Sequence, residues 1–142
     1  MSDIDYIPQL EDDGCLVACV AMVTGRPYAD IRQLCAPSYN EGIHEIIADD
    51  LLGELGYAVM RRYRHVPHLK RERAVWPCPP FAPVHICYVD ATRGPHAVVM
   101  LRTGDIYDPW KRERLTLAHP DFGVIDHIDG VFKITRPSKD QP

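Results

Sequence analysis

An unbroken run of nine apolar residues, Cys15 to Val23, places the strongest constraint on how this chain can fold. Its length and its alanine and methionine residues favour a helix over a strand, and Gly25 is suited to end that helix after Thr24. Asp12 and Asp13 are candidates for its N-terminal cap. A helix that is apolar on every face has to be buried on every face. The chain is therefore predicted to fold around this segment as a central helix.

Two further helices are predicted in the first half of the chain. One covers Pro27–Cys35, because proline is favoured in the first turn of a helix. The other covers His44–Leu55, where apolar residues recur every four positions at Ile43, Ile47, Leu51 and Leu55. Gly56 follows at the position where a helix often ends.

Strands are predicted from residue 57 onward. The candidates are Tyr57–Tyr63, Val84–Val89, His96–Arg102, Asp105–Tyr107 and Val131–Thr135. The proline-rich segment Pro77–Pro83 should be a loop, Thr103-Gly104-Asp105 a tight hairpin turn, and residues 136–142 a flexible tail. Helices followed by antiparallel strands predict an α+β fold, and a length of 142 residues suits one domain over residues 1–142.

Composition and charge narrow the setting in which the chain acts. With 46% hydrophobic and 25% charged residues, it resembles an ordinary soluble globular protein. Five cysteines, an odd number without the spacing of a disulfide scaffold, indicate reduced thiols. The chain opens on no signal-like segment, and its longest apolar run is too short to span a bilayer. A cytoplasmic location with no membrane partner is expected.

A short basic stretch at residues 61–73 interrupts an acidic chain of net charge −4. It contains five arginines and one lysine against a single glutamate. The stretch could be a solvated strand and loop, or it could bind an acidic partner. A nucleic-acid partner is not expected for an acidic chain with one short basic segment.

Four residues have the chemistry and spacing of a thiol-dependent site: Gln9, Cys15, His96 and Asp108. A thiol at the start of a helix lies at the positive end of the helix dipole, which favours the nucleophilic thiolate. The turn at Thr103-Gly104 places its two strands side by side, so that the start of the first strand lies beside the end of the second. His96 and Asp108 should therefore meet at the open end of the hairpin. A carboxylate there can orient the imidazole.

Gln9 lies six residues before Cys15, where its amide could donate to a developing oxyanion. His85 is the main rival of His96 as the base, although a paired or edge histidine is the simpler interpretation. Cys15 could instead be an inert buried cysteine, or bind a metal with Cys19 and a histidine, but a single Cys-x3-Cys spacing is weak support for a metal site. No cofactor or metal is expected.

The remaining histidines and the tryptophans show no partner pattern. Surface positions are expected for His44, His65, His68, His119 and His127. Trp76 and Trp110 are expected in the core or in the wall of a cleft, and Cys19 is expected to pack in the core.

These motifs together resemble a known enzyme family. The segment Gln9-x5-Cys15-x3-Cys19 followed by Val-Ala-Met is similar to the opening of the C39 peptidases, which are papain-like cysteine enzymes that remove double-glycine leaders from bacteriocins. Gly94-Pro-His96-Ala-Val-Val and Asp105-Ile-Tyr-Asp108-Pro109 resemble the histidine and aspartate blocks of that family. The resemblance extends from about residue 6 to residue 110.

The resemblance implies a papain-like fold and a function. It makes Cys15 the nucleophile, His96 the base, Asp108 the orienting group and Gln9 the oxyanion donor of an enzyme that hydrolyses a peptide or protein substrate. Leu16 departs from the family, which usually has glycine after the nucleophile. An acyl-transfer or deamidating enzyme with the same residues, and an inert papain-fold binding module, remain alternatives.

Overall fold

The computed structural model describes residues 4–62, 82–91, 94–110, 114–115 and 122–134, with only the backbone described for residues 62, 91, 114–115 and 122–126. The helical elements come first in the chain: α1 (Cys15–Thr24), α2 (Tyr28–Leu34), the short 3-10 helix η1 (Ala36–Ser38) and α3 (Glu45–Glu54). No helix within these residues is long and apolar enough to cross a membrane.

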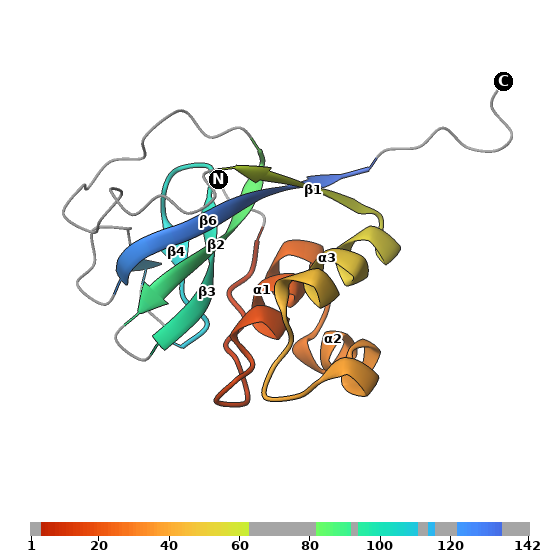
Figure 1. Ribbon diagram of the computed structural model, residues 1–142. Helices are drawn as coiled ribbons and strands as arrows, with labels where there is room; N and C mark the ends of the chain where they lie inside the picture. Colours follow the sequence, from red (N-terminus) through yellow and green to blue (C-terminus); the bar gives the residue numbers. More distant parts are fainter. Residues whose placement is uncertain (1–3, 63–81, 92–93, 111–113, 116–121, 135–142) are drawn as a thin grey trace, which may run out of the picture.

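The strands follow and form one sheet. They are β1 (Tyr57–Arg62), β2 (Val84–Ala91), β3 (Gly94–Leu101), β4 (Ile106–Tyr107), β5 (Arg114–Leu115) and β6 (Phe122–Lys133). Within the described residues their order across the sheet is β1-β6-β2-β3-β4-β5, and every neighbouring pair is antiparallel. The three α-helices gather on one side of this sheet (Figure 1). The predicted α+β class is confirmed.

Helix α1 is the centre of the core. Every residue from Leu16 to Val23 is buried, and α1 packs on β3 while contacting both α2 and α3. The helix ends at Gly25, whose φ of 69° is readily adopted by glycine. The sequence-based prediction of a buried central helix is therefore confirmed.

Alternation along the strands divides the buried side chains between the two faces of the sheet. Val84 and Ile86 of β2 belong to the same core cluster as α1, and so do Ala97, Val99 and Leu101 of β3. The residues between them, His85, Cys87, Val98 and Met100, are also buried. Because successive side chains of a strand point to opposite faces, these residues lie on the face away from α1.

The structure corrects several element boundaries. Strand β6 begins at Phe122 rather than Val131, and β5 was not predicted. The start of β6 contains acidic residues and glycine, which disfavour a strand locally, but it pairs with β2, and β1 joins the other edge of β6 from Ile128 onward. The segments at residues 77–81 and 136–142 lie outside the described residues.

The cap of α1 also differs from the prediction. Gly14 occupies the N-cap position and no side chain caps the helix. Asp13 instead accepts a hydrogen bond from the hydroxyl of Tyr39. The Asp13 carboxylate, one of the two predicted caps, therefore joins the preceding turn to a neighbouring segment.

Candidate active site

Cys15 is the first residue of α1, and it is partly exposed whereas the eight residues after it are buried. The first helical hydrogen bond runs from the Ala18 amide to the Gly14 carbonyl at 3.0 Å. The amides at the start of the helix thus have no partner inside it, and they carry the positive end of the helix dipole. A thiol at this position is accessible and lies where negative charge is favoured.

His96, near the start of β3, connects Cys15 to Asp108. Its Nε2 lies 2.6 Å from Oδ1 of Asp108, and both side chains are almost fully buried, at 8% and 4% exposed. Burial alone would lower the pKa of His96, but hydrogen bonds with Asp108 and Cys15, together with their charges, raise that pKa to about 9. The arrangement favours a protonated imidazole between two acidic groups.

Two contacts hold Asp108 in place just after β4. Its Oδ1 accepts a hydrogen bond from the backbone amide of Trp110 at 2.9 Å, and its backbone carbonyl accepts one from the hydroxyl of Tyr6 at 2.6 Å. The ring of Tyr6 meets that of Tyr107 edge-on, with centroids 5.8 Å apart. The contribution of Tyr6 could not be found from sequence, because it lies more than a hundred positions from Asp108 and belongs to no motif.

The other described thiols differ from Cys15. Cys19 and Cys87 are fully buried, and Cys35 is nearly so. Burial is the largest cause that raises the pKa of each of these three thiols above its ordinary value. Among the cysteines in the described ranges, Cys15 alone is partly exposed. The expected core position of Cys19 agrees with the structure.

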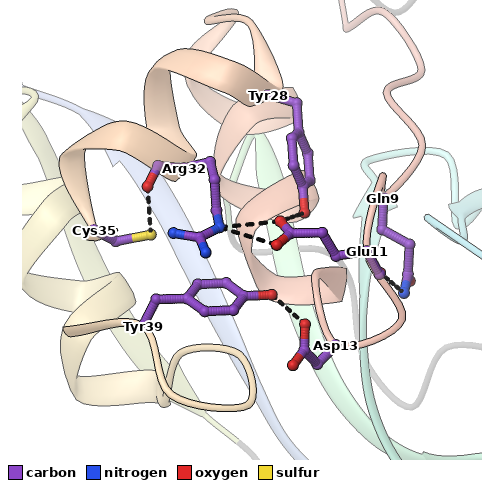
Figure 2. Close-up of polar contacts among 7 residues, drawn as sticks. All are labelled: Gln9, Glu11, Asp13, Tyr28, Arg32, Cys35 and Tyr39. Atoms are coloured by element: carbon purple, nitrogen blue, oxygen red, sulfur yellow. Dashed lines mark hydrogen bonds and ion pairs between the residues drawn. The ribbon is translucent and has the colours of Figure 1, made fainter. Parts of the chain in front are cut away.

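Gln9 lies beside this site, but its side-chain amide faces the backbone of the turn that precedes Cys15. Its backbone amide donates to the carbonyl of Pro109 at 3.1 Å, which places Gln9 next to the Asp108 segment. The side-chain nitrogen donates to the backbone carbonyls of Glu11 at 2.8 Å and Asp12 at 2.9 Å (Figure 2). In this structure the amide group therefore stabilises the turn before Cys15.

A cleft with a cavity of about 450 Å³ opens in front of Cys15 and His96. Its walls include Ile43, which lies just before α3, Glu45 at the start of α3, and Tyr88 of β2. A larger cavity, of about 590 Å³, lies near the C-terminal end of α1, but its described lining has neither cysteine nor histidine. The cleft at Cys15 is thus the one with nucleophile chemistry.

His85, the rival base, is placed away from the cleft. It is fully buried on the interior strand β2, and its Nδ1 lies 3.4 Å from the carbonyl of Met100. Burial lowers its pKa below the ordinary value, which the hydrogen bond to Met100 only partly offsets. His85 is therefore a buried, hydrogen-bonded histidine on the face away from α1, and it is not an edge histidine.

His127 corrects the prediction that it lies at the surface. It is only 6% exposed, its Nε2 contacts the carboxylate of Glu45, and its ring stacks on Tyr88 with ring centroids 4.2 Å apart. Its partners come from α3 and β2, so sequence gave no sign of them. His44 is exposed as expected, whereas His65, His68 and His119 lie outside the described residues.

Glu45, His127 and Asp129 approach one another closely enough to hold a metal ion. Arg61 already bonds to this group, at 2.9 Å from both Glu45 and Asp129, and it lies 2.8 Å from Asp49. The guanidinium supplies the positive charge that a metal would bring. Arg61 opens the basic stretch, and it serves an internal ion-pair network rather than a free basic surface.

The tryptophan prediction is corrected in part. The side chain of Trp110 is 43% exposed, so it does not belong to the core. Its backbone amide nevertheless bonds to Asp108, as described above. Trp76 and the rest of the basic stretch after residue 62 lie outside the described residues.

The helical layer on an antiparallel sheet, with a cysteine opening the central helix and a histidine near the start of a strand, is the arrangement of the papain-like fold. Sequence comparison matches the chain to no protein-family model and to no curated protein. Comparison of structures does find similar proteins, among them a double-glycine motif protease and two ComA peptidase domains.

One relative is a double-glycine motif protease from an AMS/PCAT transporter, solved in complex with the leader peptide, with a TM-score of 0.63 at 20% identity over 94% of this chain and 93% of that one. The peptidase domain of Streptococcus ComA gives a TM-score of 0.66 at 15% identity, over 93% of this chain and 99% of that one. The peptidase domain of Streptococcus mutans ComA gives a TM-score of 0.57 at 13% identity, over 89% of this chain and 98% of that one. The likeness establishes the fold and confirms the predicted papain-like architecture.

Proposed function

We propose that this chain is a cysteine peptidase that hydrolyses a peptide or amide bond, with Cys15 as nucleophile, His96 as base and Asp108 as the orienting carboxylate. The observation that carries the proposal is the continuous contact from Cys15 through His96 to Asp108, at the start of a buried helix and at the edge of a cleft. Asp108 engages Nε2, so the other ring nitrogen, Nδ1, is the one available to the thiol.

The reaction follows from the protonation state of this pair. The Cys15 thiolate attacks the carbonyl carbon, an S–C bond forms, and the carbonyl oxygen becomes an oxyanion. When the intermediate collapses, the C–N bond breaks and His96 gives its proton to the leaving amine. His96 then takes a proton from water, which attacks the thioester and releases the carboxylate product together with the Cys15 thiol.

Two donors are proposed for the oxyanion: the backbone amide of Cys15 and the side chain of Gln9. The first is supported by its position at the start of α1, where helix amides have no internal partner. For the second, the Gln9 amide has to exchange one of the carbonyls of Glu11 and Asp12 for the substrate oxygen. Its backbone bond to Pro109 keeps it close to the Asp108 segment during that exchange.

A peptide is the proposed substrate. The cleft wall is mostly apolar, with Leu16, Ile43 and Val89 among its residues, and one structural relative was solved with a leader peptide. A peptide containing a double-glycine motif is therefore the first substrate to assay.

The test compares cleavage of such a peptide set by the wild type, Cys15→Ala and Cys35→Ala. We expect the wild type and Cys35→Ala to cleave the same peptide, and Cys15→Ala to bind it without cleaving it. Melting temperatures check that both variants fold. Equal cleavage by Cys15→Ala would contradict the proposed nucleophile.

Gln9→Ala tests the oxyanion role without a known substrate. Acylation of Cys15 by p-nitrophenyl acetate forms an oxyanion, whereas alkylation by iodoacetamide does not. Loss of one oxyanion donor typically costs about 10²–10³-fold, so we expect acylation to fall by that factor while alkylation changes little. Equal losses in both reactions would show that Gln9 only supports the turn.

A further inference from the structure

The turn formed by residues 9–14, here called the entry turn, places three carboxylates directly before Cys15. Negative charges near a thiol oppose formation of the thiolate. The structure directs two of these carboxylates onto the neighbouring helical segments, since Glu11 contacts Arg32 and Tyr28 of α2 and Asp13 contacts Tyr39 (Figure 2).

Arg32 is the centre of these contacts. Its Nε lies 3.0 Å and 3.1 Å from the two carboxylate oxygens of Glu11. The first of these oxygens also accepts the Tyr28 hydroxyl at 2.7 Å. The guanidinium lies over the ring of Tyr39, 3.5 Å from its centroid. Arg32 thus joins Glu11 to Tyr39, the side chain that holds Asp13.

Glu11 is also held through its backbone. Its carbonyl accepts the side-chain nitrogen of Gln9 at 2.8 Å and the amide of Gly14 at 3.1 Å. Gly14 is the residue before Cys15, and Gln9 is the proposed oxyanion donor. The Glu11 carbonyl is thus bonded to both neighbours of the proposed oxyanion site, Gln9 and the residue before Cys15.

The entry turn fits closely against its surroundings at two glycines. A Cβ on Gly14 would lie 2.0 Å from the Tyr28 hydroxyl, and a Cβ on Gly42 would lie 2.6 Å from the carbonyl oxygen of Asp13. Both distances are far below van der Waals contact. The turn can approach α2 at Gly14, and the segment before α3 at Gly42, this closely only because these side chains are absent.

The ion pair itself is half exposed, with 31% of the Arg32 side chain and 36% of the Glu11 side chain accessible. Exposed pairs of this kind contribute little to global stability, and the core lies around α1. We propose that Arg32 is a positioning residue, which acts through Glu11 to hold the entry turn, and with it the backbone of Gln9 and the start of α1, in place beside the proposed oxyanion site. This inference rests on the proposed cysteine-peptidase function.

The experiment measures two reactions of Cys15 in wild type, Arg32→Met and Arg32→Lys. Misplaced catalytic groups cost rate steeply, so we expect p-nitrophenyl acetate acylation to fall by about tenfold in Arg32→Met. Iodoacetamide alkylation should change by less than about twofold, because it uses no oxyanion site. Arg32→Lys keeps the charge but not the planar guanidinium, so it should restore only part of the acylation rate.

Arg26→Met is the matched control, because Arg26 is an exposed arginine just after the far end of α1. It should leave both rates unchanged. If Arg32→Met fails to fold, Glu11→Gln removes the same ion pair and should give the same pattern. Full rescue by Arg32→Lys would mean that charge alone matters, and an unchanged acylation rate in Arg32→Met would overturn the proposal.

Coupling with Gln9 separates positioning from general support of the fold. If Arg32 acts through the entry turn, adding Arg32→Met to Gln9→Ala should cost much less acylation than it costs in the wild type. Additive losses would refute action through Gln9. A wild type whose Cys15 is not acylated at all would contradict the proposed function, whereas an acylated wild type with an insensitive Arg32 would contradict only this inference.

Discussion

Asp108 should control the protonation of His96, and Asp108→Asn tests this directly. The pKa of His96 stands at about 9 against an ordinary value of 6.5, which corresponds to about 3 kcal/mol in favour of the imidazolium. Burial of the ring works against this value, and the bonds and charges of Asp108 and Cys15 outweigh it. The 2.6 Å contact with a carboxylate that is itself 4% exposed makes Asp108 the stronger of the two partners.

Replacing the carboxylate by an amide removes its charge but keeps its shape. An opposite charge at this range typically changes a pKa by about 1–3 units, so the His96 pKa should fall by that amount in Asp108→Asn. An NMR titration of the labelled imidazole measures it without any substrate. Asp105→Asn, the same change at the hairpin turn, should leave the His96 pKa where it is.

The kinetic consequence has a defined direction. The proposed mechanism needs protonated His96 to release the amine, so activity in the wild type should decline as pH rises through about 9. In Asp108→Asn this alkaline limb should move to lower pH, and the maximal rate should fall because the imidazole is no longer oriented. A His96 pKa that does not change in Asp108→Asn would refute the assigned role of the carboxylate.

Three further predictions concern stability. Because the folded-state pKa of His96 lies above its ordinary value, the contribution of His96 to the free energy of unfolding is complete below pH 6.5 and is lost as pH rises toward 9. Urea denaturation should therefore show that the free energy of unfolding falls by up to about 3 kcal/mol over that range, and this loss should be absent in His96→Asn. Gly14→Ala should destabilise by about 1–3 kcal/mol through its clash with the Tyr28 hydroxyl, and the Tyr28→Phe background should recover part of this cost. Arg61→Met should destabilise by about 3 kcal/mol, because it leaves the buried carboxylate of Asp129 without its cation, and Asp129→Asn should restore part of the loss.

Sequence reasoning succeeded where the determining contacts are local or are set by hairpin geometry. The apolar run from Cys15 predicted a buried helix because no face of it tolerates water. The tight turn at Gly104 set the hairpin register, with Val99 opposite Tyr107, and so brought His96 and Asp108 together. Neither inference needed knowledge of distant segments.

The prediction was wrong or incomplete where contacts with distant segments determine the local structure or the burial of a residue. The first half of β6 contains residues that disfavour a strand, yet it pairs with β2, and this pairing outweighs the local preference. His127 is buried because Glu45 and Tyr88 surround it, and both are far away in sequence. Two of the three carboxylates before Cys15 bind Arg32 and the tyrosines of α2 and its flank, and these partners are also distant in sequence.

The proposal that Cys15 is the nucleophile is tested most directly by competitive alkylation of the native protein with a limiting amount of iodoacetamide near neutral pH, followed by mass-spectrometric mapping of each cysteine. The accessible thiol beside His96 should be modified well before Cys19, Cys35 and Cys87, whose pKa values are raised by burial. That preference should weaken in His96→Ala, which removes the base. Modification of Cys15 at the same rate as Cys35, in a protein that remains folded, would contradict the account.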